Sequence, residues 1–146
     1  MEQIRDYQQS RVYRWQAKHL PNGGTVHITN AQAIVNHIWS DFGLEYPPIV
    51  EQIDVRTKKW AGKANRLTIW LQSEVSLRTI IHEVAHSMTS NVYGESAQHG
   101  PIFMGVYSKL LQKFLDVDVL HIIQTCAIEN VDIDINASPI FTDEGA

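Results

Sequence analysis

Residues 78–90 read RTIIHEVAHSMTS, and apolar side chains recur in and around this segment at every third or fourth position. That spacing predicts an amphipathic helix with one apolar face. We expect Ser73 to be its N-cap, Glu74 to lie in its first turn and Gly94 to end it, because each residue type favours that position. Such a helix is expected to pack its apolar side against the core of a globular protein.

Three polar residues of this helix form the pattern His82-Glu83-x-x-His86. At about 100° per residue, the two histidines lie about 40° apart, with Glu83 beside them, on a face nearly opposite the apolar stripe. Imidazoles at positions i and i+4 of a helix can both bind one zinc ion, and Glu83 can then act on water beside the metal. The alternative is a solvated helix face that binds no metal. We expect the histidines to face a cleft, where a third ligand would decide between the two.

The composition is that of one domain, with 146 residues of which 44% are apolar. The N-terminus has no apolar run of signal-peptide length, and no stretch approaches the roughly 20 apolar residues of a membrane span. We therefore expect a soluble, cytoplasmic protein. The net charge of −4 does not indicate a nucleic-acid partner over the whole surface. The single cysteine, Cys126, lies in an apolar run, which predicts a buried thiol and excludes a cysteine-rich zinc ribbon.

The rest of the chain predicts an α+β fold in one domain spanning residues 1–146. Helical spacing of apolar residues predicts helices within residues 1–20, 29–43, 101–114 and 119–128. In the second of these, Thr29 and Gln32 resemble a capping box. Alternating apolar residues predict a strand over 49–55, paired with a second strand over 66–72 through a polar hairpin loop. Residues 131–146 are expected to add a strand or to form a flexible tail.

Four residues after His86 are candidates for the third metal ligand: Glu95, His99, His121 and Glu129. The metzincin pattern fails, because Thr89 and Val92 stand where it requires glycine and histidine. We favour His99, because it precedes Gly100 and Pro101 and so lies on a turn that can fold back over the helix. Glu95 begins a less constrained loop, and His121 lies among apolar residues that indicate packing.

The two motifs IIHEVAH and HGPIF, in this order, resemble those of the SprT-like zinc metallopeptidases, which include bacterial members and Spartan-type relatives. The resemblance covers about residues 56–115, including the segment KKWAGKANRLTIWLQ before the helix. It implies a zincin-like minimal metalloprotease core, with helices packed on a small antiparallel sheet. It also implies that His82, His86 and His99 bind Zn²⁺ and that Glu83 is the catalytic acid/base.

The expected function is hydrolysis of peptide bonds in a protein or peptide substrate, by Glu83-assisted attack of zinc-bound water. Three imidazoles leave zinc one open position, as in catalytic sites. The strand at 67–71 is expected to pair with an extended substrate beside the cleft. Tyr93 and Tyr107 are candidate donors to the oxyanion, although each is more typical of packing or loop structure.

Two alternatives belong to other functional classes. One is a non-catalytic binding module stabilised by zinc, against which Glu83 argues because a structural site needs no base. The other is a DNA-associated factor that uses the basic segment 56–66, for which the simpler interpretation is a solvated hairpin loop. The residues of that segment expected to contact DNA weakly are Arg56, Lys58, Lys59, Trp60, Lys63 and Arg66. A zinc hydrolase acting on a non-peptide amide is a closer variant, because the same groups serve either substrate.

Overall fold

The structure, a computed structural model, describes residues 6–54 and 61–140. Within them the chain forms five α-helices and five β-strands, which confirms the α+β class. The helices are α1 (Gln9–His19), α2 (Ile28–Asp41), α3 (Leu77–Met88), α4 (Pro101–Phe114) and α5 (Val119–Ile128). The strands are β1 (Thr25–His27), β2 (Ile49–Gln52), β3 (Gly62–Ala64), β4 (Thr68–Leu71) and β5 (Glu74–Ser76).

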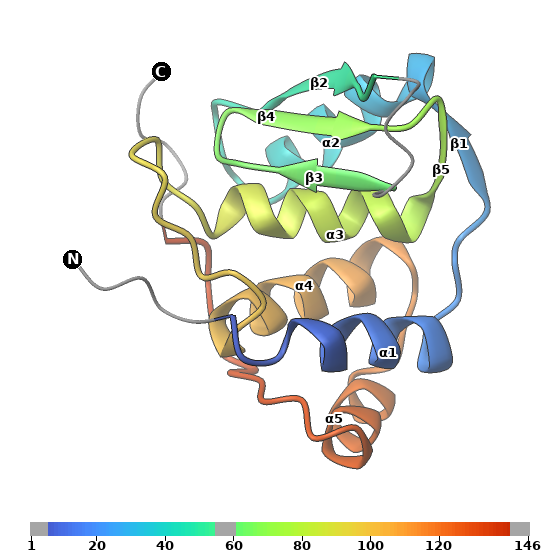
Figure 1. Cartoon of the computed structure of the whole chain (residues 1–146), viewed down its shortest axis with the longest axis vertical. Coiled ribbons are helices and arrows are strands. Elements are labelled where there is room, and N and C mark those ends of the chain that lie inside the picture. The colour runs from blue at the N-terminus through green and yellow to red at the C-terminus, as the bar shows by residue number, and fades with distance from the viewer. Residues whose placement is uncertain (1–5, 55–60, 141–146) are drawn as a thin grey trace.

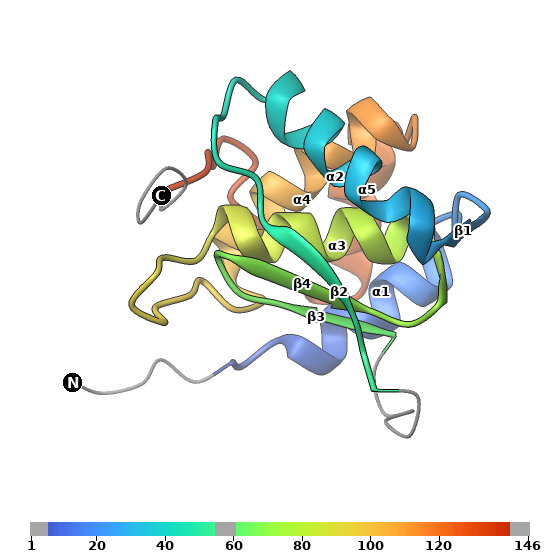
Figure 2. The same ribbon diagram turned by 90° about the horizontal axis from the view of Figure 1, so that it is seen from above.

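Helix α3 occupies the centre of the molecule. The sheet formed by β2, β4 and β3 covers one side of it, and α1 and α4 lie on the other side, with α5 beyond them (Figure 1). Helix α2 runs beside α3 next to β2 (Figure 2). The core between these layers contains the fully buried side chains of Trp15, Trp39, Ile80, Phe103 and Tyr107. Because α3 is covered from several directions, residues on every side of it are shielded from water.

The strands predicted at 49–55 and 66–72 pair with each other as expected, but the predicted hairpin connection between them is wrong. β2 pairs with β4 in parallel, with Ile49 opposite Thr68, and the antiparallel partner of β4 is β3. The tight turn between β3 and β4 is closed by Asn65, whose Oδ1 accepts hydrogen bonds from the backbone N–H groups of Leu67 (3.1 Å) and Thr68 (2.9 Å). The three-stranded sheet is therefore mixed rather than antiparallel, and only the small β1–β5 sheet is purely antiparallel.

Helix α3 begins later and ends earlier than the sequence predicts. Residues 74–76 form β5, which pairs with β1, so Glu74 lies in a strand and not in a first helical turn. The N-cap is Ser76, whose Oγ accepts a hydrogen bond from the Thr79 N–H at 3.1 Å, a contact worth about 1 kcal/mol in typical helices. The helix ends at Met88, well before Gly94. Pairing with β1 thus overrides the local preference of residues 73–76 for the start of a helix.

The other four helices agree with the prediction more closely. Pro101 opens α4 at its first turn, and α5 spans the predicted apolar run. Helix α2 has His27 as its N-cap instead of the predicted Thr29, because the His27 Nδ1 accepts a hydrogen bond from the Thr29 N–H at 3.2 Å. Among the helices of the described chain, none combines the length and the apolar character needed to span a bilayer.

Residues 131–140 form neither a strand nor a free tail, since they lie against α4 and the end of α3. The Asp134 N–H donates to the Pro101 carbonyl at 3.0 Å, and the Ile140 N–H donates to the Met88 carbonyl at 3.3 Å. Gly105 makes this contact possible, because a Cβ atom there would lie 1.9 Å from the Asp134 carbonyl oxygen. The predicted strand is therefore absent from the described part of this segment, and residues 141–146 lie outside that part.

Candidate metal centre

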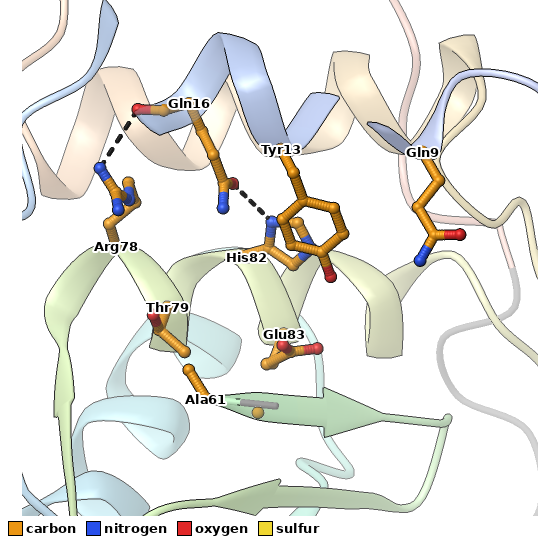
Figure 3. A pocket seen from close by; sticks show the side chains of 9 residues that line it. Gln9, Tyr13, Gln16, Ala61, Arg78, Thr79, His82 and Glu83 are labelled. Atoms are coloured by element: carbon orange, nitrogen blue, oxygen red, sulfur yellow. Dashed lines mark hydrogen bonds between the residues drawn. The ribbon is translucent and has the colours of Figure 1, made fainter. Parts of the chain in front are cut away.

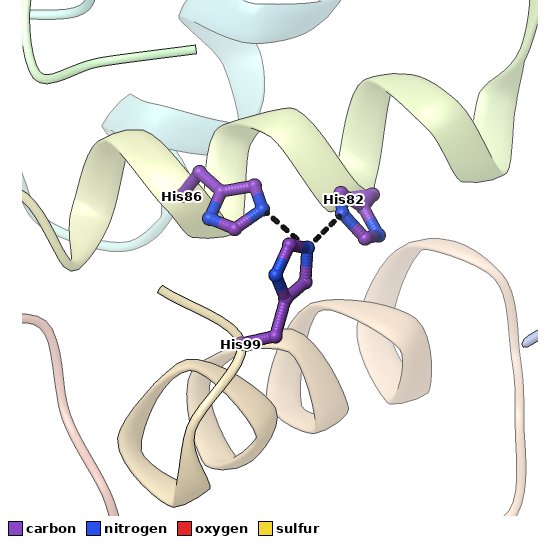
Figure 4. A group of neighbouring side chains, drawn as sticks. All are labelled: His82, His86 and His99. Atoms are coloured by element: carbon purple, nitrogen blue, oxygen red, sulfur yellow. Dashed lines mark hydrogen bonds between the residues drawn. The ribbon is translucent and has the colours of Figure 1, made fainter. Parts of the chain in front are cut away.

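Three histidine side chains converge from two segments of the chain. His82 and His86 lie one turn apart on α3, and His99 lies on the loop immediately before α4 (Figure 4). The Nε2 atom of His99 is 3.0 Å from that of His86 and 3.3 Å from that of His82. The loop returns to α3 as expected: the Ala97 N–H donates to the Thr89 carbonyl at 2.9 Å.

These distances fit one metal ion. Three nitrogens that each lie 2.0–2.1 Å from a tetrahedral ion are separated by about 3.3–3.4 Å. The ligand atoms of the three histidines all lie within 4.8 Å of one another, close enough to bind a metal ion. Imidazole nitrogens suit zinc and also copper, nickel and iron. Among the described residues no other group of His, Cys, Asp or Glu side chains has this arrangement.

The other candidates for the third ligand lie elsewhere. Glu95 is exposed on the loop after α3. His121 is exposed on α5 and donates from Nε2 to the His19 carbonyl at 2.7 Å. Glu129, at the end of α5, accepts a hydrogen bond from His19 Nε2 at 2.8 Å. The structure therefore brings His99, and none of these three residues, to His82 and His86.

The polar face of α3 is buried rather than solvated, which argues against the alternative of a solvated helix face, and His82 and Glu83 line a cavity as the expected cleft requires. His82 is 2% exposed, Glu83 4% and His99 5%, while His86 is half-buried. Burial holds the pKa of His82 and of His86 well below the usual value, and the neighbouring histidines add to this effect. Both imidazoles are therefore neutral near pH 7, which is the form that binds a metal.

Phe103 forms an apolar floor beneath the three histidines. Its ring is stacked on His86 with centroids 4.3 Å apart, and it also contacts His82 at 5.1 Å and His99 at 5.2 Å. Phe103 is fully buried on α4, four residues after His99. The aromatic residue of the HGPIF motif thus has a structural reason for its spacing, because it restricts the orientation of all three imidazole rings.

A cavity of about 360 Å³ opens beside the metal centre and is lined by residues of α1, α3 and the start of β3 (Figure 3). Both His82 and Glu83 line it. Burial raises the pKa of Glu83 to about 8. A cation held by the histidines would oppose this shift, because a nearby positive charge favours the carboxylate. Glu83 thus lies at the wall of a cavity that is also lined by His82, one of the three histidines that could hold a metal ion.

Tyr13 is a site residue that sequence analysis missed. Its ring stacks on His82, with centroids 5.4 Å apart and planes inclined by 23°, and it lies 5.3 Å from the His99 ring. Figure 3 shows Tyr13 extending from α1 toward α3, with its hydroxyl on the side of Glu83. Burial, with smaller contributions from Glu83 and Asp6, raises the pKa of Tyr13 to about 12, so the hydroxyl remains a donor. No sequence motif identifies Tyr13, because α3 begins 64 positions after it in the chain.

The two tyrosines considered from sequence have other positions. Tyr93 is 81% exposed on the loop after α3. Tyr107 is fully buried on α4, where its hydroxyl donates to Gln16 Oε1 at 2.9 Å, and burial raises its pKa far above the usual value. In contrast, the Tyr13 hydroxyl has no hydrogen-bond partner among the described residues, and Tyr13 lines the cavity.

The basic segment 56–66 is only partly described. Arg66 is 1% exposed, its guanidinium lies 4.8 Å from the Trp39 ring, and it donates to the Tyr46 carbonyl at 2.9 Å. Its predicted contact with DNA is therefore wrong, because the side chain is buried. Lys63 is exposed on β3, with its Nζ 5.0 Å from the Trp70 ring. The remaining members of the set lie outside the described residues: Arg56, Lys58, Lys59 and Trp60.

Comparisons with known proteins identify no relative of this chain, since no family model, curated protein or solved structure matches it. The resemblance to SprT-like metallopeptidases therefore remains an expectation from two short sequence motifs.

Proposed function

We propose that this protein is a zinc-dependent metallopeptidase with a SprT-like, zincin-like core. The observation that carries the proposal is the position of Glu83: it lines a cavity together with His82, whose Nε2 converges with those of His86 and His99. A site that merely stabilises the fold needs no carboxylate in such a cavity. Zinc is the metal we propose, because three neutral imidazoles retain its positive charge and leave one position for a ligand.

When bound, zinc supplies a Lewis acid that polarises a carbonyl group and lets water act as a nucleophile near neutral pH. Glu83 accepts the proton of the attacking water and then delivers it to the leaving amine. Tyr13 donates its hydroxyl proton in a hydrogen bond to the oxygen that becomes negatively charged at the scissile carbon. The buried surroundings strengthen both interactions, because few water molecules compete for these groups.

The substrate is proposed to be an extended stretch of polypeptide. The strand first considered for pairing with it, 67–71, is excluded: β4 lies between β2 and β3, so both of its edges are paired. β3 is an edge strand of the sheet, it packs on α3, and Gly62 at its start lines the cavity. Among the described strands only β4 pairs with β3, and an extended peptide added to the other edge of β3 would have its main chain fixed beside Glu83 with little dependence on sequence.

The test of this function combines metal analysis with hydrolysis of casein by the purified chain. We expect about one zinc per chain, proteolysis that a chelator abolishes, and recovery of activity when zinc is restored. Stoichiometric zinc without hydrolysis of casein or of unfolded peptides would instead support the non-catalytic module. DNA association through Lys63 and the neighbouring lysines remains a prediction, and salt-dependent binding of a short single strand tests it.

A further inference from the structure

We infer that Asp6 and Gln16, in and just before α1, position two of the three metal ligands and determine which nitrogen each offers to the metal. The inference rests on the metal-binding part of the proposed function and is independent of hydrolysis. Both residues lie far from the histidine motifs in sequence, and neither belongs to those motifs.

Asp6 holds His99 through two hydrogen bonds. The His99 Nδ1–H donates to Asp6 Oδ2 at 2.7 Å, and the His99 backbone N–H donates to Asp6 Oδ1 at 3.3 Å. Nearby, Gln8 donates from Nε2 to the His99 carbonyl at 2.7 Å, so the N-terminal segment also fixes the backbone of His99. Because a carboxylate oxygen can only accept, the proton of a neutral His99 ring lies on Nδ1 and the lone pair lies on Nε2.

Gln16 holds His82 in the same way. The His82 Nδ1–H donates to Gln16 Oε1 at 2.8 Å (Figure 3). The same oxygen also accepts a hydrogen bond from the Tyr107 hydroxyl at 2.9 Å. The backbone of Gln16 is fixed as well, since Arg78 Nη1 donates to the Gln16 carbonyl at 3.1 Å. The proton of neutral His82 therefore lies on Nδ1, and its Nε2 also has a free lone pair.

These two contacts have a joint consequence for the metal centre. The Nε2 atoms of His82 and His99 are 3.3 Å apart, and in neutral rings neither carries a proton that could form a hydrogen bond to the other. Two facing lone pairs repel each other unless a cation lies between them. Asp6 and Gln16 thus orient the rings for metal binding before the metal arrives.

The contacts could in principle serve only to attach α1 to the remainder of the fold, so the test must separate positioning from attachment. Zinc affinity measured by competition with a chromophoric chelator reports on the ligands, and circular dichroism of the metal-free chain reports on folding. Matched controls are offered by Asp132, in the segment after α5, and by Gln9 on α1. Asp132 accepts a hydrogen bond from Tyr7 and contacts no metal ligand, and Gln9 lines the same cavity as Gln16 without bonding to a histidine.

We expect Asp6→Asn and Gln16→Leu each to weaken zinc binding by about 10- to 100-fold. The controls Asp132→Asn and Gln9→Leu should bind zinc as the unaltered chain does. Gln16→Glu retains an oxygen that can accept both hydrogen bonds and should therefore restore the affinity that Gln16→Leu loses. In the cobalt-substituted protein, the visible spectrum should change in Asp6→Asn and Gln16→Leu and remain unchanged in the controls.

Three results would overturn the inference. The first is zinc affinity in Asp6→Asn and Gln16→Leu equal to that of the controls, although the unaltered chain binds zinc. The second is a loss in Gln16→Glu as large as in Gln16→Leu, since Gln16 would then not act as an acceptor. The third is absence of zinc binding by the unaltered, folded chain. This result would also rule out the proposed metal centre. It differs from the first result because the unaltered chain and all of its variants would then fail to bind zinc.

Discussion

Gly62 at the start of β3 lies directly against Glu83 of α3: a Cβ atom at residue 62 would stand 3.1 Å from both Cγ and Oε2 of the Glu83 side chain. It would also stand 3.0 Å from Leu71 Cδ2, so the space around residue 62 is closed on two sides. The absence of a side chain at this position therefore helps to define where the carboxylate of Glu83 lies.

Enlarging Gly62 should displace Glu83 without removing a metal ligand. We expect Gly62→Ala to reduce peptide hydrolysis modestly and Gly62→Val to reduce it by up to about 100-fold, because small displacements of a reacting group have large kinetic effects. Zinc content should stay near that of the unaltered chain in both variants. Unchanged hydrolysis by a folded Gly62→Val protein would show that the carboxylate is not held by this contact.

Replacing Glu83 by Gln should separate metal binding from chemistry. The amide can still form hydrogen bonds to water but cannot accept its proton, so we expect hydrolysis to fall by about 100- to 10,000-fold while zinc content is retained. Glu95→Gln, at an exposed position, is the matched control and should remain active. A zinc-loaded Glu83→Gln protein with full activity would rule out the proposed role of Glu83.

Removing His99 tests the third ligand. His99→Ala should lose most of the bound zinc, because only two imidazoles remain and the carboxylates considered from sequence lie elsewhere. His121→Ala removes an exposed histidine from α5 and should retain zinc. Metal content measured on purified, folded variants gives the answer, and equal content in the two would require a different ligand set.

Tyr13→Phe tests the proposed oxyanion donor. The ring that stacks on His82 is retained, so zinc content should not change, whereas loss of the hydroxyl should lower kcat by about 100- to 1,000-fold with little change in KM. Tyr93→Phe, on the exposed loop, is the control and should have no effect. If kcat/KM fell by a similar factor because KM rose while kcat stayed unchanged, Tyr13 would act in substrate binding instead.

Cys126 gives a prediction that depends only on the fold. The thiol is 1% exposed, and burial raises its pKa to about 12, from an ordinary value of 9.0. At pH 8 we expect iodoacetamide to alkylate the folded chain at least about 100-fold more slowly than the chain in denaturant, because the thiolate is the reactive form. The unfolded chain can ionise this thiol from about pH 9, whereas the folded chain does so only near pH 12. The free energy of unfolding is therefore unaffected by Cys126 below pH 9 and falls as the pH rises from 9 toward 12. Rapid alkylation of the native chain would contradict the packing of α5.

Local sequence determined the helices and the types of residue at the metal centre. Pro101 marks the start of α4 because proline is suited to a first helical turn, and residues i and i+4 share a helix face because helical geometry is constant. The proximity of His82 and His86 follows from that geometry alone. His99 could be favoured because the Gly-Pro sequence after it indicates a turn, which is also a local property.

Only the tertiary structure decided how the strands pair and what surrounds the histidines. β2 and β4 are parallel because the chain crosses over between them, and the start of α3 moves to Leu77 because residues before it pair with β1. The contact between Asp6 and His99 joins residues 93 positions apart, and that between Gln16 and His82 joins residues 66 apart. Neither pairing leaves a periodic pattern in the sequence, because each depends on how α1 packs against α3 and α4, and that packing is determined by burial of side chains from the whole chain.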